Sequence, residues 1–154
     1  MREVITITHD LYEADYEELL DLLVKHARQF SLAWLKDAEY RESADRIRAA
    51  LEPYLIMEEE RRKTKSTSAR ESEAVVRYYR VKQEAVDILK NAEHLFSWLS
   101  PDYPEELTFY SEGGEDLMWV VVNEDLAYMS KCTFTIEHVS EIVIGASLCE
   151  QSIE

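Results

Sequence analysis

Residues 107–122 read LTFYSEGGEDLMWVVV and give the clearest structural signal in the chain. Two short runs rich in β-branched and aromatic residues, 107–110 and 117–122, flank the pair Gly113-Gly114. Residues of these types favour extended strands, and a glycine pair between two such runs is typical of a tight turn. The stretch therefore predicts two antiparallel strands joined by a hairpin.

Further strands are expected on both sides of this hairpin. Asn123-Glu124-Asp125 predicts a turn, and the segments 127–136 and 141–148 predict the third and fourth strands of a meander. The apolar run in 141–148 also fits a helix, so both assignments stay open there. Near the start of the chain, the unbroken β-branched run VITIT at 4–8 predicts a strand that joins the meander at an edge.

The first half of the chain shows a helical period instead. Apolar residues recur at three- and four-residue spacing over residues 11–35, and Asp10 and Glu13 are spaced as a capping box at the start of this helix. A second pattern covers 44–57, where Pro53 predicts a kink or a junction between two helices.

A third helical pattern predicts a long helix in the middle of the chain. It begins after the capping-box pair Ser68 and Glu71 and ends near Leu99, before Pro101. Such a helix of about 28 residues would span roughly 42 Å. The exposed loop expected at 63–70 (KTKSTSAR) would then lie at the tip of a helical hairpin.

These patterns predict one α+β domain over residues 1–154. It has three main helices, including the long helical hairpin, and an antiparallel β-meander of about four strands that the N-terminal strand joins. The chain of 154 residues suits one compact domain, and no linker or repeat divides it.

Acidic residues dominate the composition and restrict the class of partner. The chain has 32 acids and 17 bases and a net charge of −15, and residues 101–154 contain only one base, Lys131. A charge of this size repels nucleic acid and anionic lipid and speeds encounter with basic surfaces. Its ordinary interpretation is that it keeps the protein soluble.

One short stretch runs against this charge. It contains five bases without an intervening acid, namely Arg61, Arg62, Lys63, Lys65 and Arg70. One interpretation is a phosphate or nucleic-acid contact, but no aromatic residue is present for base stacking and the rest of the molecule is acidic. A second is contact with an acidic surface on another protein or on a second copy of the chain. The third and plainest is a solvated loop.

Familiar catalytic and metal-binding motifs are missing from the sequence. The three glycines, at 113, 114 and 145, cannot form a nucleotide-binding loop, and Cys132 and Cys149 are too far apart for a C-x-x-C metal site. No carboxylate precedes His26 or His94 by three residues, as a di-iron site would require. We therefore expect no metal and no cofactor, and the sequence leaves open whether His26 or His94 lines a pocket.

No run of about 18 apolar residues is present for a membrane span, and no apolar segment near the N-terminus is typical of a secretory signal. The expectation is a cytoplasmic protein without membrane contact.

The leading hypothesis is a small acidic protein-binding module for a basic protein partner, acting as an inhibitor, an immunity-type protein or a regulatory adaptor. Its alternatives are a small enzyme with a pocket between helices and sheet, using His26 or His94, and a nucleic-acid mimic. Carboxylates beside aromatic residues in the last third of the chain form the expected contact surface: Glu105, Glu106, Tyr110, Glu112, Glu115, Asp116, Trp119, Glu124 and Asp125.

Overall fold

The computed structural model describes residues 2–61 and 73–153. Within them, eight strands form one antiparallel sheet in the order β3-β4-β2-β5-β6-β7-β1-β8. The strands are β1 (Arg2–Ile7), β2 (Gln29–Leu35), β3 (Leu55–Arg61), β4 (Ala74–Arg80), β5 (Glu105–Tyr110), β6 (Asp116–Val121), β7 (Leu126–Ser130) and β8 (Leu148–Ile153).

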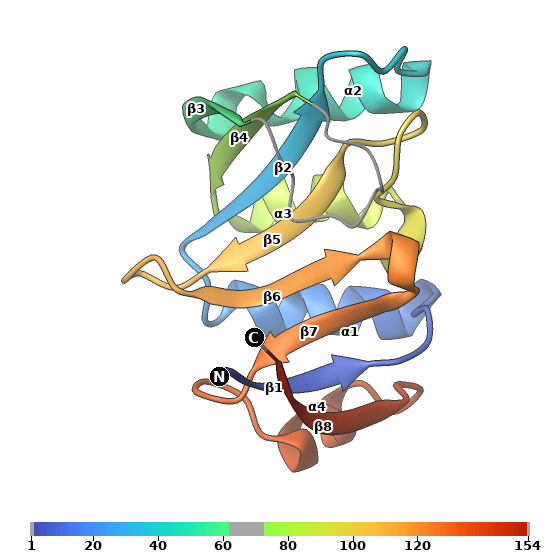
Figure 1. Cartoon of the computed structure of the whole chain (residues 1–154), viewed down its shortest axis with the longest axis vertical. Helices are drawn as coiled ribbons and strands as arrows, with labels where there is room; N and C mark the ends of the chain where they lie inside the picture. Colours follow the sequence, from blue (N-terminus) through green and yellow to red (C-terminus); the bar gives the residue numbers. More distant parts are fainter. Residues whose placement is uncertain (1, 62–72, 154) are drawn as a thin grey trace.

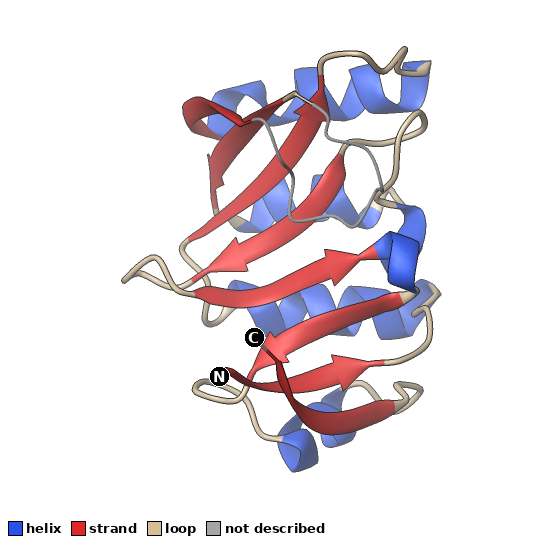
Figure 2. Ribbon diagram, viewed as in Figure 1, coloured by secondary structure: helices blue, strands red, loops and turns tan. Residues whose placement is uncertain are grey.

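Four α-helices in the described part of the chain cover one face of this sheet (Figures 1 and 2). They are α1 (Glu13–Val24), α2 (Glu42–Leu51), α3 (Gln83–Lys90) and α4 (Ile136–Ile142), with short 3₁₀ turns at η1 (Glu52–Tyr54), η2 (Leu95–Ser97) and η3 (Val122–Glu124). Contacts between neighbouring helices give the order α2, α3, α1, α4 across the face. None of the described helices is long and apolar enough to span a membrane.

The main hydrophobic core lies between this helical layer and the sheet. Phe30, Tyr79 and Phe109 come from three neighbouring strands, and their rings contact one another at centroid distances of 5.2 and 5.7 Å. The buried Tyr16 hydroxyl of α1 donates to the Leu89 carbonyl of α3 at 2.7 Å, so a hydrogen bond within the core fixes these two helices. Two smaller apolar clusters occupy the opposite, open face.

The hairpin prediction is confirmed, because β5 and β6 pair antiparallel around the turn that contains Gly113 and Gly114. The N-terminal strand also forms, but its expected edge position is wrong. β1 pairs with β7 on one side and with β8 on the other, inside the sheet. Residues 127–136 form a strand only as far as Ser130, and 141–148 is neither one strand nor one helix, because α4 ends at Ile142 and β8 begins at Leu148.

The predicted helix over 11–35 is wrong in its second half. α1 ends at Val24, and residues 29–35 form β2 in the interior of the sheet. Phe30 and Leu32 pack in the main core, whereas Ala33 and Leu35 pack in a cluster on the open face. A strand with apolar residues on both faces loses its two-residue alternation and imitates the spacing of a helix.

The prediction of a long helical hairpin is also wrong. The prediction that a four-stranded meander forms the whole sheet is wrong as well. Its first arm ends with α2 at Leu51; Pro53 lies in η1, and β3 follows directly. Its second arm contains β4, and only residues 83–90 are helical. The β-branched and aromatic residues of β4 pair with β2 along seven residues, so sheet pairing prevails over the helical spacing. The loop 63–70 and the Ser68–Glu71 capping box lie outside the described residues.

Candidate functional site

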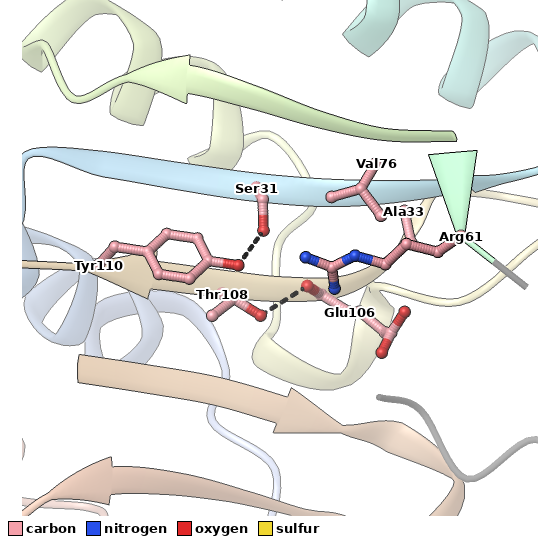
Figure 3. A pocket seen from close by; sticks show the side chains of 7 residues that line it. All are labelled: Ser31, Ala33, Arg61, Val76, Glu106, Thr108 and Tyr110. Carbon is pink, nitrogen blue, oxygen red and sulfur yellow. Dashed lines mark hydrogen bonds between the residues drawn. The ribbon is translucent and has the colours of Figure 1, made fainter. Parts of the chain in front are cut away.

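A polar cluster on the open face joins residues from four strands (Figure 3). At its centre, Ser31 of β2 and Tyr110 of β5 share a hydrogen bond of 2.8 Å between their hydroxyl groups. Figure 3 shows the Arg61 side chain reaching over this part of the sheet from the end of β3. The residues around the cavity are Ser31, Ala33, Arg61, Val76, Glu106, Thr108 and Tyr110.

Next to the cavity, Glu59, Arg61 and Tyr78 form a closed hydrogen-bond network. The Arg61 guanidinium donates to the Glu59 carboxylate at 2.7 Å and to the Tyr78 hydroxyl, and that hydroxyl donates to Glu59 at 2.7 Å. The hydrogen bond from Tyr78, followed by that from Arg61, lowers the pKa of Glu59. Burial, together with the hydrogen bond to this carboxylate, raises the pKa of Tyr78. The network therefore keeps Glu59 ionised and Tyr78 protonated.

The size of the cavity decides what this cluster can do. Its volume is about 10 Å³, which is close to the smallest space that holds one water molecule. A substrate or a partner side chain does not fit there. The cluster therefore has no room for a ligand in this structure, and its hydrogen bonds join β2 to β5 and β3 to β4.

The structure does not gather the sequence-predicted contact residues on one surface. Glu112, Glu115 and Asp116 lie at the turn between β5 and β6, whereas Glu124 and Asp125 lie at the other end of β6. Six residues of strand separate the two groups by roughly 20 Å.

The other predicted contact residues, Glu105, Glu106, Tyr110 and Trp119, are buried in the sheet. Glu105 accepts hydrogen bonds from the Ser100 amide and hydroxyl, and the Arg2 guanidinium lies 4.9 Å from the centre of the Trp119 ring. Of the basic stretch, Arg61 closes the network above, and Arg62, Lys63, Lys65 and Arg70 lie outside the described residues.

An acidic cleft that was not predicted from the sequence lies between α1 and the end of α3, and it is larger than the cavity at Ser31 and Tyr110. It has a volume of about 430 Å³ and is lined by Glu13, Glu17, Lys90 and Glu93. A space of this size can hold a side chain of a partner, but it is open to solvent and lined by charged groups, unlike the enclosed and mostly apolar pockets of small ligands. None of its three carboxylates forms an ion pair within residues 2–61 and 73–153, and Lys90 is engaged elsewhere, 2.7 Å from Asp21 and 3.5 Å from Asp87. Among the described residues, the three carboxylates of the cleft therefore have no cation paired with them.

An aromatic pair lies directly beside this cleft. Tyr12 is 61% exposed as a residue, and its ring stacks on the His94 imidazole at 5.1 Å with an angle of 26° between the ring planes. His94 Nδ1 lies 2.6 Å from Asp10 Oδ2, and Asp10 Oδ1 accepts from the Leu11 and Phe96 amides at 2.8 and 2.9 Å. Asp10 thus holds His94 in place, and His94 supports the exposed tyrosine.

The backbone at this point is strained. Glu13 and Glu93 have positive φ angles of 48° and 74°, and the Glu13 amide donates to the Glu93 carbonyl at 3.3 Å. Each such residue costs on the order of 1–3 kcal/mol unless its surroundings impose the conformation, and strain of this kind concentrates at functional sites. The predicted Asp10–Glu13 capping box is wrong, because the residue before α1 is Tyr12 and Asp10 bonds to other amides.

Of the two histidines singled out in the sequence, only His94 lies near a cleft. His26 is exposed and contacts Phe134 edge to face at 5.1 Å. The spacing of Glu13, Glu17 and Asp21 at every fourth position was visible in the sequence and places them along one side of a helix. Glu93 is some 80 residues away, and no local pattern connects it with α1.

Cys132 and Cys149 are free and exposed. Within the described residues, no group of three or more histidine, cysteine or carboxylate side chains is arranged to hold a metal ion. Comparisons with protein families, with curated proteins and with solved structures found no match to this chain.

Proposed function

We propose that the chain is an intracellular protein-binding module for a basic partner, acting as an inhibitor, an immunity-type protein or a regulatory adaptor, and that the partner docks at the cleft between α1 and α3. The observation that carries the proposal is a cleft whose three carboxylates form no ion pair within the described residues, beside a fixed, exposed tyrosine. Free thiols at Cys132 and Cys149 suit a reducing compartment such as the cytoplasm.

Electrostatics support a cationic side chain as the occupant. The chain carries a net charge of −15, so a basic protein is attracted to it over a distance set by the Debye length, about 8 Å at physiological salt. At close range, Glu13, Glu17 and Glu93 attract the cationic side chain. Lys90 does not neutralise them, because its ammonium group is paired with Asp21 of α1 and Asp87 of α3. Long-range attraction speeds association, and the cleft selects where the partner binds.

Tyr12 supplies the apolar part of such a contact. Tyrosine is enriched at binding hot spots because its rigid ring buries a large area and loses little conformational entropy. Here the ring is already ordered by stacking on His94, so binding does not have to immobilise it. Its exposed face is available to a guanidinium or an ammonium group.

The proposal is tested with a fluorescent hexaarginine peptide as the probe. The triple variant Glu13→Gln/Glu17→Gln/Glu93→Gln is expected to bind at least about tenfold more weakly than the natural chain, a change of about 1.4 kcal/mol. Amide shifts in NMR spectra of the complex should cluster on α1 and the α3–η2 turn, and affinity should fall as sodium chloride rises.

The matched control is Glu112→Gln/Glu115→Gln/Glu124→Gln, which removes the same charge from acids outside the cleft. It should weaken binding less than about threefold, since only the long-range attraction changes. Equal losses in the two triple variants would show that net charge alone attracts the peptide, and the cleft would be rejected as the contact. An affinity that does not change with the salt concentration would contradict the proposal of a basic partner.

A further inference from the structure

A second cleft lies between α2 and α3, beside the acidic cleft. Its volume is about 290 Å³, and α2 lines it with Ser43, Arg46, Ile47 and Ala50. This α2–α3 cleft and the acidic cleft lie on opposite sides of α3, because α3 packs between α2 and α1 (Figure 1). On α3 and the turn after it, Ile88 and Asn91 line one cleft, and Lys90 and Glu93 line the other. Both clefts are therefore at the C-terminal end of the same helix.

Tyr103 connects the two clefts. Its side chain lines the α2–α3 cleft, and its ring packs against the buried Trp98 ring at a centroid distance of 5.3 Å. Burial, followed by the carboxylates of Glu93 and Asp102, raises the pKa of Tyr103. The tyrosine hydroxyl is therefore within electrostatic reach of an acid that lines the other cleft. The two clefts are thus neighbouring parts of one surface.

The lining of the α2–α3 cleft favours an apolar occupant. Ile47, Ala50 and Ile88 supply aliphatic groups, and the two isoleucines also contact the main hydrophobic core. The Ser43 hydroxyl is already engaged, because it donates to the Asp102 carbonyl at 2.6 Å. An aliphatic side chain of a partner gains free energy when it leaves water for such groups, and it needs no new hydrogen bond.

Charge distinguishes the two clefts. Among the described residues that line the α2–α3 cleft, Arg46 carries the only charge, and its guanidinium pairs with the exposed Glu42 carboxylate at 2.6 Å. The acidic cleft has three carboxylates, and its Lys90 is engaged with other acids. A basic side chain is therefore attracted to the acidic cleft, whereas Arg46 disfavours it in the α2–α3 cleft.

The distance between the clefts sets the spacing of the two side chains that could fill them. The axes of packed helices are about 8–10 Å apart, so grooves on either side of one helix are separated by roughly the same distance. Three residues of extended chain span about 10 Å. A basic residue and an apolar residue three positions apart in an extended segment can therefore occupy both clefts.

We propose that an extended segment of the partner binds through two side chains, a basic one in the acidic cleft and an apolar one, three residues away, in the α2–α3 cleft. This inference rests on the proposed function, because the acidic cleft is the anchor of the segment. Once the basic side chain is bound, the apolar one is held near its own cleft at an effective concentration of about millimolar order. An open contact that binds a free apolar molecule weakly then adds to the affinity of the whole segment.

Two fluorescent peptides test the apolar contact. Each contains the same hexaarginine run; one has Leu-Gly-Gly before it and Gly-Gly-Leu after it, and the other has serine in place of both leucines. The two ends allow for either chain direction, and the peptides have the same length and charge. The leucine peptide should bind the natural chain at least about fivefold more tightly than the serine peptide. Methyl NOEs in NMR spectra should connect its leucine with Ile88.

Variants on α2 locate the contact. Ala50→Glu places a carboxylate in the α2–α3 cleft, which an apolar side chain would have to remove from water, so the preference for leucine should fall below about twofold. The matched control Ala49→Glu makes the same charge change on α2 outside the lining of the cleft and should keep the preference. Both alanines are exposed, so both variants should fold, and circular dichroism checks this.

The outcomes separate this inference from the proposed function. Equal affinities of the two peptides, still dependent on salt, would overturn the apolar contact and leave the basic partner in place. A preference for leucine that is the same in Ala50→Glu and Ala49→Glu would also overturn it, because the contact would then lie elsewhere. If neither peptide bound the natural chain, the proposed function and this inference would be rejected together.

Discussion

Single residues show how the sheet keeps charged groups in a buried position. Only 7% of the Arg77 side chain is exposed, and its guanidinium is 2.6 Å from Glu58 and 3.0 Å from Glu52. Both carboxylates are about half exposed, so part of the pair stays hydrated. This arrangement avoids the full desolvation penalty of a buried ion pair and still bonds the cation at both ends.

Replacing Arg77 should therefore destabilise the protein moderately. Arg77→Met keeps most of the packing but removes the charge-assisted hydrogen bonds, and we expect the free energy of unfolding to fall by about 1–3 kcal/mol. Urea denaturation measures the change. The control Arg46→Met removes an exposed ion pair with Glu42 on α2, which should change the stability by less than about 0.5 kcal/mol. If the two variants lost the same free energy of unfolding, Arg77 would contribute no more to stability than an exposed surface charge.

The Glu59 network makes a prediction about pH. Tyr78 and Arg61 hold the pKa of Glu59 below its ordinary value of 4.5. A carboxyl whose pKa is lower in the folded protein stabilises the fold above its ordinary pKa and loses this contribution as the pH falls through the folded value. The free energy of unfolding should therefore decrease as the pH is lowered from 4.5.

Tyr78→Phe removes the largest cause of this shift. In the variant, NMR titration of the side-chain carboxyl carbons should show the pKa of Glu59 closer to 4.5, and the loss of stability in acid should become smaller. Glu60 is the internal reference, because Lys36 and not Tyr78 lowers its pKa. A Glu59 titration that is identical in the two proteins would contradict this account of the network.

At the scale of elements, the β5–β6 hairpin shows why a turn can be predicted from its residues. Gly114 has a φ of +85°, which residues with a side chain rarely adopt, whereas Gly113 does not need this conformation. Gly114→Ala should lower the free energy of unfolding by about 1 kcal/mol. Gly113→Ala should change it by less than about 0.5 kcal/mol, since its new methyl group would meet no atom closer than 3.8 Å. Urea denaturation of the two variants compares them directly.

The same scale shows where the sequence stops being informative. The hairpin and β1 were predictable because their turn residues and β-branched runs are local signals. β2 was not, because burial on both faces removed the alternation that identifies a strand. β4 was not predictable either, because its identity depends on pairing with β2, whose residues lie about 40–50 positions earlier in the chain. Local propensity cannot report a partner at that distance.

The candidate site follows the same rule. The acids of α1 are spaced along one side of a helix, and this spacing could be seen in the sequence. Glu93 and His94 reach α1 through the bridge between Tyr12 and His94, which only the folded chain creates. Acids are concentrated in residues 101–154, but the fold places Glu112, Glu115 and Asp116 at one end of β6 and Glu124 and Asp125 at the other. Charge density along a chain therefore gives the net charge but does not show where the charged side chains gather in the fold.

For the whole molecule, the net charge of −15 implies that the folded state repels itself. The ion pairs outside Arg77 are mostly on exposed side chains, such as Arg41 with Asp102 and Arg46 with Glu42, and pairs of this kind contribute about 0–1 kcal/mol each. Repulsion acts among many more carboxylates, and unfolding relieves it because the chain expands. When salt screens these charges, the relief of repulsion should therefore change the free energy of unfolding more than the weakening of the ion pairs does.

Raising sodium chloride from about 10 mM to 150 mM shortens the Debye length from roughly 30 Å to 8 Å. We expect the free energy of unfolding to increase over this range, as measured by urea denaturation at pH 7.

The variant Glu13→Gln/Glu17→Gln/Glu93→Gln should gain less stability from salt than the natural chain, because it has lost three mutually repelling charges from one cleft. The control Glu112→Gln/Glu115→Gln/Glu124→Gln should fall between the two, since its acids are divided between two ends of a strand. A stability that decreases with salt would mean that attractive pairs dominate the electrostatics of the fold. Repulsion among the three carboxylates of the cleft would then be too weak to make the cleft a preferred contact for a basic partner.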